Sequence, residues 1–228
     1  MSPRISLQAL ASRKTRYSAA LMLSGGKDSA YLAYQLVEKR QNVIAVTNDV
    51  GFMSDVAKDN ISKIVEDSGI DHIWLRGDKS AHLQVVDNFR KIEDQGIQDV
   101  CGACTLLTTE KVIEFCLQNG IGRIISGFTP YSVGGPRSKR LTLTCGIVYE
   151  RPYHDWYDLK HISEFLEGRG IVTDPTKTNC LYTKEIINTH TERFGVNPYL
   201  QEFSALLRDG HITEEEFENY RAWLLASP

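Results

Sequence analysis

The chain has 228 residues, of which 42% are hydrophobic and 24% are charged, so it is long enough to bury one large core with a small appendage. Its formal net charge of -3 argues against a protein that binds nucleic acid mainly by bulk electrostatic attraction. No stretch approaches the roughly 20 apolar residues of a membrane span, and the basic N-terminus lacks the apolar run of a signal peptide, so a cytoplasmic protein with no membrane partner is expected.

Residues 1–16 carry several cations and are expected to form a short basic helix or arm that packs on the core. The apolar strand Ala19–Leu23 then leads into the loop Ser24–Ser29, which a predicted helix follows. Two adjacent glycines, Gly25 and Gly26, allow the backbone to adopt positive φ and to approach an anion closely. This order of elements predicts a phosphate-binding loop at the start of a helix.

Polar groups in and after this loop also suit an anion. The hydroxyls of Ser24 and Ser29 are hydrogen-bond donors, and Lys27 adds a full positive charge. The first turn of the helix supplies unsatisfied amides and about half a unit of positive charge. The competing interpretation is an ordinary Gly-Gly turn whose polar neighbours have no common role.

The six residues Ser24-Gly25-Gly26-Lys27-Asp28-Ser29 resemble the SGGxDS signature of the PP-loop family of ATP pyrophosphatases. In that family the loop holds the pyrophosphate of ATP while a substrate oxygen attacks the α-phosphate. The resemblance therefore implies an ATP site formed by all six residues, with Mg²⁺ and Lys27 neutralising the leaving pyrophosphate. It also implies that Asp28 orders the loop or the hydrated metal.

Later segments alternate strands and helices in the manner of parallel βαβ units, which predicts an α/β fold. We expect an open, mainly parallel, doubly wound sheet with the site at the carboxyl ends of its strands, followed by a small C-terminal helical extension. Residues 1–190 are the expected catalytic domain and residues 191–228 the extension. The expected elements after the first helix are a strand at Asn42–Thr47, a helix at about Ser54–Ser68, a strand at Asp71–Leu75, helices at about Ser80–Ile92 and after Cys101, and a strand at Arg123–Gly127.

Two positions at the expected carboxyl edge match places where PP-loop proteins hold adenosine. Asn48 follows the second strand and Gly127 ends the fourth, and the resemblance implies that the backbone of Gly127 lies along the adenine. A turn formed by Asn48 and Asp49 is the alternative for the first position. The family often continues with Gly-His and a nearby acid, whereas this chain continues with Phe128 and Thr129. The departure removes an expected group near the metal.

Five cysteines, odd in number and partly clustered, suit metal or sulfur chemistry in a reducing compartment better than a disulfide framework. Cys101 and Cys104 form a CxxC at the start of a predicted helix, where the helix dipole lowers thiol pKa and favours metal ligation or thiolate reactivity. Cys116 lies in an apolar run and is expected in the core, and Cys145 is expected to be structural.

Between Pro130 and Arg151 a loop is expected at residues 134–140, in which Arg137, Lys139 and Arg140 cluster. Three cations in four residues do not belong in a core. The cluster is either part of a solvated loop or a clamp for a phosphate or an acidic substrate.

The run from Arg151 to Lys184 resembles a passage of the tRNA-modifying PP-loop enzymes. Two thiolating branches of those enzymes hold a 4Fe-4S cluster with a CxxC and a cysteine near this passage, where Cys180 stands in this chain. The resemblance implies that Cys101, Cys104 and Cys180 are ligands, with one open iron that binds sulfide. The alternatives are a persulfide on Cys104 or Cys180, a structural zinc, or buried thiols.

Together these features predict an ATP-dependent sulfur transferase that adenylates a carbonyl oxygen, releases pyrophosphate and replaces the oxygen with sulfur. Lys27, Asp28, Cys104 and Cys180 are the expected catalytic residues, and the substrate is a base in tRNA or a free small molecule. A non-catalytic nucleotide-binding module is the alternative outside the enzymes, but such a module has no use for clustered thiols.

The C-terminal segment is expected to be helical, with a capping box formed by Thr213 and Glu216. The stretch 210–216 is also similar to the end of the N-acetyl sugar amidotransferases, which keeps ammonia as an alternative nucleophile and a sulfur or ammonia donor protein as an expected partner. The apolar face that carries Phe217 and Tyr220 either packs within the chain or forms a homodimer.

Overall fold

The computed structural model describes residues 16–91, 100–132, 138–195 and 197–225, so most of the expected basic arm and part of the expected cationic loop lie outside the described residues. Within these ranges a six-stranded sheet has the order β3-β2-β1-β4-β6-β5. Neighbouring strands pair in parallel except for β5 and β6, which are antiparallel. The strands are β1 (Ala19–Met22), β2 (Val43–Asp49), β3 (Asp71–Arg76), β4 (Arg123–Ile125), β5 (Arg140–Thr142) and β6 (Val148–Glu150).

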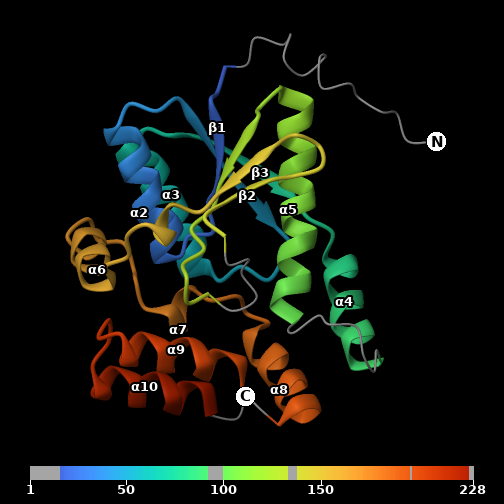
Figure 1. The fold of residues 1–228 in the computed structure, drawn as a ribbon, viewed down its shortest axis with the longest axis vertical. Coiled ribbons are helices and arrows are strands. Elements are labelled where there is room, and N and C mark those ends of the chain that lie inside the picture. The colour runs from blue at the N-terminus through green and yellow to red at the C-terminus, as the bar shows by residue number, and fades with distance from the viewer. Residues whose placement is uncertain (1–15, 92–99, 133–137, 196, 226–228) are drawn as a thin grey trace.

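Helices cover both faces of the sheet (Figure 1). On one face α2, α3 and α6 share a core with Leu21 of β1, and on the other face α5 shares a core with Ala20. This arrangement confirms the expected α/β fold with an open, mainly parallel sheet. None of the described helices has both the length and the apolar character needed to cross a membrane. The helices are α2 (Lys27–Glu38), α3 (Asp55–Ser68), α4 (Lys79–Lys91), α5 (Val100–Asn119), the 3-10 helix η1 (Pro152–His154), α6 (Leu159–Glu167), α7 (Pro175–Thr178), α8 (Thr183–Phe194), α9 (Pro198–Arg208) and α10 (Glu214–Leu225).

Strand β1 is apolar because both of its faces are covered. Ala19 and Leu21 are buried on the α2 side, and Ala20 is buried on the α5 side. The strand is also paired along both edges, with Ala20 opposite Ile44 of β2 and Ile124 of β4. The loop that follows β1 is therefore held at the middle of the sheet, at its carboxyl edge.

The expected loop at residues 134–140 lies partly outside the described residues, and its last residue, Arg140, instead begins strand β5, which forms a hairpin with β6. The amide of Leu143 donates to the carbonyl of Ile147 at 2.9 Å within the turn between the two strands. Strand β6 then pairs in parallel with β4, with Glu150 opposite Ile125. Every residue of β5 is exposed, so this edge strand lacks the alternation of buried and exposed positions that would reveal it in the sequence.

Helices α8, α9 and α10 lie beyond the carboxyl end of the sheet (Figure 1). The rings of Phe203 in α9 and Tyr220 in α10 stack with centroids 4.5 Å apart, so the apolar face of α10 packs within the chain. Thr213 and Glu216 form the expected capping box: the Thr213 amide donates to Glu216 Oε2 at 2.7 Å, and the Glu216 amide donates to Thr213 Oγ1 at 3.2 Å. The expected domain boundary after residue 190 falls inside α8.

Candidate active site

The loop after β1 requires glycine at only one of its two glycine positions. Gly25 has a φ of +77°, and a Cβ placed there would lie 2.2 Å from the carbonyl oxygen of Ala57 in α3. Gly26 is the N-cap of α2 and has a φ of -80°. A Cβ at Gly26 would meet only Ser24 Oγ, at 3.6 Å, which is an ordinary contact. Positive φ is therefore a property of Gly25 alone, and Gly26 leaves open space beside the start of α2.

Asn60 of α3 holds this loop from the protein side. Its Nδ2 donates to the carbonyl of Gly25 at 2.8 Å and to the carbonyl of Val172 at 2.8 Å, and its Oδ1 accepts from the Val172 amide at 3.0 Å. The residue is 3% exposed, so both amide hydrogens of a buried side chain are used. Sequence reasoning misses Asn60 because its partners lie 35 and 112 positions away along the chain.

The two serines of the loop have different surroundings. Ser29 is buried, and its Oγ accepts from the Ser24 amide at 3.1 Å and donates to the carbonyl of Gly26 at 3.1 Å. The two hydroxyl oxygens are 3.1 Å apart, so Ser24 Oγ donates to Ser29 Oγ when Ser29 donates to Gly26. Ser24 is exposed. Ser29 therefore closes the loop internally, whereas Ser24 is at the surface and its Oγ accepts from the Gly26 amide at 3.4 Å.

Lys27 and Asp28 begin α2 and are fixed by two tyrosines from the segment before α6. Lys27 Nζ donates to Asp28 Oδ2 at 2.7 Å and to Tyr157 Oη at 3.0 Å, and Tyr153 Oη donates to the carbonyl of Asp28 at 2.7 Å. Burial alone would lower the pKa of Lys27, but the Asp28 carboxylate and Tyr157 outweigh it and raise the pKa above its ordinary value. Lys27 is therefore a cation at neutral pH, placed at the positive end of α2.

The second oxygen of Asp28 is available to a ligand. Asp28 Oδ1 is buried and has no hydrogen-bond partner among the described residues. A buried carboxylate oxygen without a partner is unfavourable, and a hard divalent cation is one of the groups that satisfies it. Asp28 therefore has one oxygen that holds Lys27 and one that fits a magnesium ion.

Two residues expected to hold adenosine lie along the carboxyl edge. A Cβ at Gly127 would lie 2.8 Å from the amide nitrogen of Ser29, so the end of β4 is in direct contact with the start of α2. Asn48 Nδ2 donates to Thr108 Oγ1 at 3.3 Å, while its Oδ1 is buried without a partner in the described part of the chain. The neighbouring Asp49 makes a turn, because its Oδ1 accepts from the Gly51 amide at 2.8 Å. The turn-forming role thus belongs to Asp49, and Asn48 is left with an acceptor that no described group uses.

The cysteines lie on neighbouring elements on the α5 side of the same edge. Cys101 and Cys104 of α5 pack against Ile186 of α8 together with Tyr182, and the Cys180 thiol is 3.4 Å from the Tyr182 amide that donates to it. Tyr182 in turn stacks on Phe52, which follows β2, with ring centroids 4.9 Å apart. The CxxC and the segment of Cys180 therefore both lie near Tyr182.

These cysteines do not assemble into a metal site. No group of three His, Cys, Asp or Glu side chains within the described ranges is placed to hold a metal ion, and Cys101 Sγ is instead 3.1 Å from Tyr199 Oη. The three-cysteine arrangement implied by the resemblance thus does not fit a 4Fe-4S cluster here. Burial raises the pKa of the Cys180 thiol, although the residue as a whole is exposed. Cys116 is fully buried, which raises its pKa to about 12 and confirms its place in the core.

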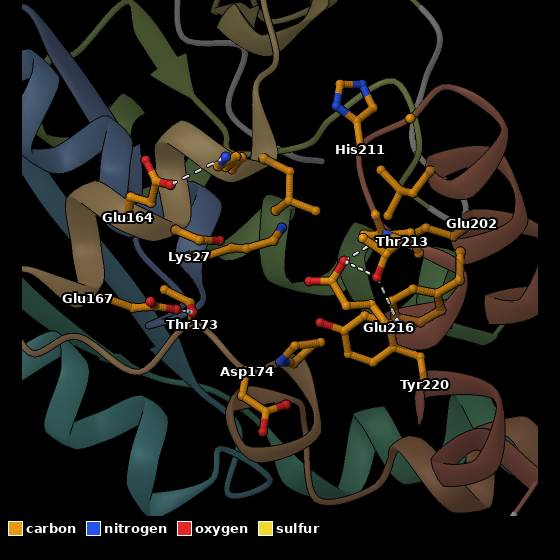
Figure 2. Close-up of a pocket in the computed structure, with 18 residues that line it drawn as sticks. Lys27, Glu164, Glu167, Thr173, Asp174, Glu202, His211, Thr213, Glu216 and Tyr220 are labelled. Carbon is orange, nitrogen blue, oxygen red and sulfur yellow. Dashed lines mark hydrogen bonds and ion pairs between the residues drawn. The ribbon is translucent and has the colours of Figure 1, made fainter. Parts of the chain in front are cut away.

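A cavity of ≈ 780 Å³ lies beside Lys27, between the segments of α6 and α7 and those of α9 and α10. Figure 2 shows Lys27 on one wall and Glu216 and Tyr220 on the opposite wall. Carboxylates outnumber lysines in its lining, so the cavity favours a divalent cation or a neutral or cationic group over a free anion. The charged lining residues are Lys27, Lys160, Glu164, Glu167, Asp174, Glu202 and Glu216.

Among solved structures, the chain is similar to an NMN synthetase from Francisella tularensis, with a TM-score of 0.51 and 13% sequence identity over 92% of this chain and 84% of that chain. The two chains share a fold. An NH3-dependent NAD synthetase from Campylobacter jejuni subsp. jejuni has a lower TM-score of 0.46, with 11% sequence identity over 95% of this chain and 87% of that chain. A phosphoadenylyl-sulfate reductase from Candida auris also has a TM-score of 0.46, with 10% sequence identity over 74% of this chain and 79% of that chain. No protein-family model and no curated protein matches the sequence.

Proposed function

We propose that the chain is an adenylating enzyme of the PP-loop type, which binds ATP on the loop Ser24–Ser29 and transfers AMP to a carbonyl oxygen of its substrate. The observation that carries the proposal is the geometry at the start of α2. Gly25 is held by Asn60, a charged Lys27 stands at the positive helix end, and Asp28 keeps one buried oxygen without a partner. Each of these features suits a bound polyphosphate with its metal ion.

The reaction follows from these groups. A substrate oxygen attacks the α-phosphorus, the bond between this phosphorus and the bridging oxygen breaks, and pyrophosphate leaves with the electron pair. The amides at the start of α2 and the Lys27 ammonium stabilise the charge that builds on the leaving group. Mg²⁺ held by Asp28 Oδ1 would supply further charge neutralisation when bound. Gly26 leaves room for close approach of the phosphates, and Ser24 adds an exposed hydroxyl.

Adenosine is proposed to lie along the carboxyl edge between Asn48 and Gly127. The orphaned Asn48 Oδ1 accepts hydrogen bonds only, which suits a hydroxyl or an exocyclic amine of the nucleoside. Gly127 is in contact with Ser29, so a nucleoside above β4 is adjacent to the phosphate loop. The distance between neighbouring strands, about 4.8 Å, makes the span from β2 to β4 roughly 10 Å, with the loop after β1 between them.

The finer proposal is that sulfur displaces AMP from the adenylated carbon, with Cys104 or Cys180 carrying the sulfur as a persulfide. The support is that both cysteines lie near Tyr182 at the same edge of the sheet. The terminal sulfur forms the new bond to carbon and AMP leaves. A thiolate, from Cys101 or from a donor protein, then attacks the cysteine sulfur, so that the S–S bond breaks, a new disulfide forms and the thiocarbonyl product departs. The substrate is a tRNA base or a small molecule.

The test is whether pyrophosphate appears. The full chain, ATP, Mg²⁺ and candidate carbonyl substrates are mixed with a persulfide donor or with ammonium, and pyrophosphate, phosphate and AMP are measured. Pyrophosphate and AMP in equal amounts are expected, with sulfur incorporated into the product. Lys27→Ala is expected to abolish pyrophosphate release. Its matched control is Lys58→Ala, because Lys58 also pairs with an aspartate, Asp55, at 3.5 Å but lies outside the loop.

Other outcomes of that experiment separate the alternatives. Product formed with ammonium and not with sulfur would replace the sulfur step by an amidotransferase reaction while keeping adenylation. Inorganic phosphate in place of pyrophosphate would overturn the adenylation proposal. ATP binding with no turnover of any carbonyl substrate would leave a nucleotide-binding module as the better description.

A further inference from the structure

Arg151 is a buried charge with no acidic partner among the described residues. The residue is 0% exposed, and its Nη2 donates to Ser138 Oγ at 3.1 Å. Its Nε and Nη1 are buried and have no hydrogen-bond partner in the ranges described. The guanidinium carbon also lies 6.0 Å from the centre of the Tyr149 ring. A buried guanidinium whose donors are mostly unused is strongly unfavourable unless something else pairs with it.

The backbone of Arg151 lies at the same edge of the sheet as the proposed site. It directly follows β6, in which Glu150 lies opposite Ile125 of β4, and the carbonyl of Glu150 accepts from the Ser126 amide at 2.9 Å. Arg151 is therefore level with Ser126 and Gly127 at the carboxyl edge, one strand from the glycine that touches α2. Two strand spacings, roughly 10 Å, separate it from the line of β1 and its phosphate loop.

A second unpartnered nitrogen lies in the turn that follows. His154 Nε2 is buried without a partner in the part of the chain described, and the His154 amide donates to the carbonyl of Arg151 at 3.3 Å. Burial, and then the positive charge of Arg151, lower the pKa of His154. The same turn contains Tyr153, which donates to the carbonyl of Asp28. One short turn, bonded directly to the phosphate loop, thus carries two side chains that each have buried nitrogen atoms without a partner among the described residues.

We propose that Arg151 binds an anionic oxygen group, a carboxylate or a phosphate, on the substrate that is adenylated. This assignment rests on the proposed function. A guanidinium matches both groups by donating two parallel hydrogen bonds, and a buried pair of this kind is strong because little water competes. The cavity beside Lys27 is a poor alternative place for the anion because carboxylates dominate its lining. Ser138 is exposed, so exchange of its hydroxyl for a ligand oxygen gives the anion a route to Nη2.

The first measurement compares the unfolding temperatures of the wild type and of Arg151 variants. It distinguishes an arginine that binds a ligand from one that stabilises the fold. Arg151→Met keeps an unbranched apolar side chain that replaces the stem of the arginine, and it removes the guanidinium and its charge. Because the charge has no acidic partner among the described residues, the variant is expected to unfold at the same temperature as the wild type or higher. A marked loss of stability in Arg151→Met that Arg151→Lys restores would show that the charge supports the fold, and would overturn the proposal.

The second measurement tests whether sodium phosphate or sodium acetate binds. Binding is detected as a rise in the Tm of the full chain, in the presence of Mg²⁺ and of α,β-methylene-ATP to fill the loop. One probe is expected to raise Tm in the wild type, and which one does so identifies the substrate group. Arg151→Met is expected to lower the affinity for that probe roughly tenfold or more. Arg140→Met is the matched control, because Arg140 lies on the neighbouring hairpin strand and pairs with Glu150 at 3.4 Å.

Three results would count against the assignment. An unchanged Tm rise in Arg151→Met would place the anion elsewhere. Loss of the rise when the ATP analogue is added would mean that Arg151 holds a phosphate of the nucleotide itself. No rise with either probe in the wild type would remove the anion site. Failure of the analogue to bind, with a rise that still depends on Arg151, would instead contradict the proposed function and leave the anion site standing.

Discussion

The ammonium of Lys27 lies 3.0 Å from the phenolic oxygen of Tyr157, a contact that joins two residues 130 positions apart in the chain. Tyr157 and Tyr153 come from the segment between β6 and α6, and both bond to the first turn of α2. Lys27 belongs to the segment that resembles the SGGxDS signature, but tyrosines outside that segment fix its position. Its second partner, Asp28 at 2.7 Å, keeps it close to the backbone of the loop.

Lys27→Met should abolish pyrophosphate release and weaken binding of ATP. A charge-assisted hydrogen bond to phosphate is worth roughly 1.5–3 kcal/mol, which corresponds to a roughly 10- to 150-fold loss of affinity. Isothermal titration with α,β-methylene-ATP measures the loss, and circular dichroism checks the fold. Tyr157→Phe removes only one of the two contacts of Lys27 and should cost less. Equal affinity of Lys27→Met and the wild type for α,β-methylene-ATP would contradict this prediction.

The two loop glycines should differ sharply when replaced by alanine. Gly25→Ala combines a positive φ with a contact of 2.2 Å to the Ala57 carbonyl, so it should lower the free energy of unfolding by roughly 1–3 kcal/mol or more. Gly26→Ala meets nothing closer than 3.6 Å and should fold with nearly wild-type stability. Urea unfolding measures both. If phosphate approaches Gly26 as proposed, Gly26→Ala should still lose nucleotide affinity, and unchanged affinity would place the phosphate elsewhere.

Stability should fall in mild acid because of His72. Its Nε2 lies 2.8 Å from Thr47 Oγ1, which already donates to the carbonyl of Leu23, so the histidine is the donor in this contact. Burial lowers its pKa in the folded chain, so the unfolded chain binds the proton first as pH falls. Stability is thus lost below the unfolded value of about 6.5, with a slope of at most about 1.4 kcal/mol per pH unit for this one proton. His72→Gln should flatten the profile between pH 7 and 5, and an identical slope would contradict the assignment.

Cysteine variants test the sulfur step. Cys104→Ser or Cys180→Ser should stop thiolation while pyrophosphate release continues, because adenylation needs neither thiol. Mass spectrometry of the protein treated with a persulfide donor should find one added sulfur on the residue that matters. Cys145→Ser is the control, since Cys145 packs against the α5-side core. Brown protein with broad absorption near ~400 nm after anaerobic purification would restore the iron-sulfur interpretation, which the described residues do not support.

The strand, loop and helix from Ala19 to Glu38 follow from the sequence because their signals are local. A continuous apolar run indicates a strand buried on both faces, and adjacent glycines before a helix indicate a turn that exposes amides. The capping box of Thr213 and Glu216 is equally local and is confirmed by both of its hydrogen bonds. In such cases the residues that decide the structure lie within one or two turns of each other.

What the sequence does not reveal depends on distant partners. The exposed strand β5 exists only because β6 pairs with it, and β6 is positioned by β4. The role of Asn60 depends on carbonyls contributed by the loop and by Val172. The burial of Arg151 without an acidic partner in the described ranges has no local signal at all. The resemblance implied that three cysteines converge on a metal, whereas Cys101 contacts Tyr199 instead.

The hydrogen bonds of Asn60 set an order of events during synthesis of the protein. Its side chain joins Gly25, close to the start of the chain, to Val172, which the ribosome adds much later. Until Val172 has been added, Asn60 lacks the carbonyl that accepts from its Nδ2 and the amide that donates to its Oδ1. The loop at residues 24–29 therefore cannot reach its final form as an early, independent unit. A fragment that ends before residue 172 should bind ATP poorly, even though it contains the entire motif.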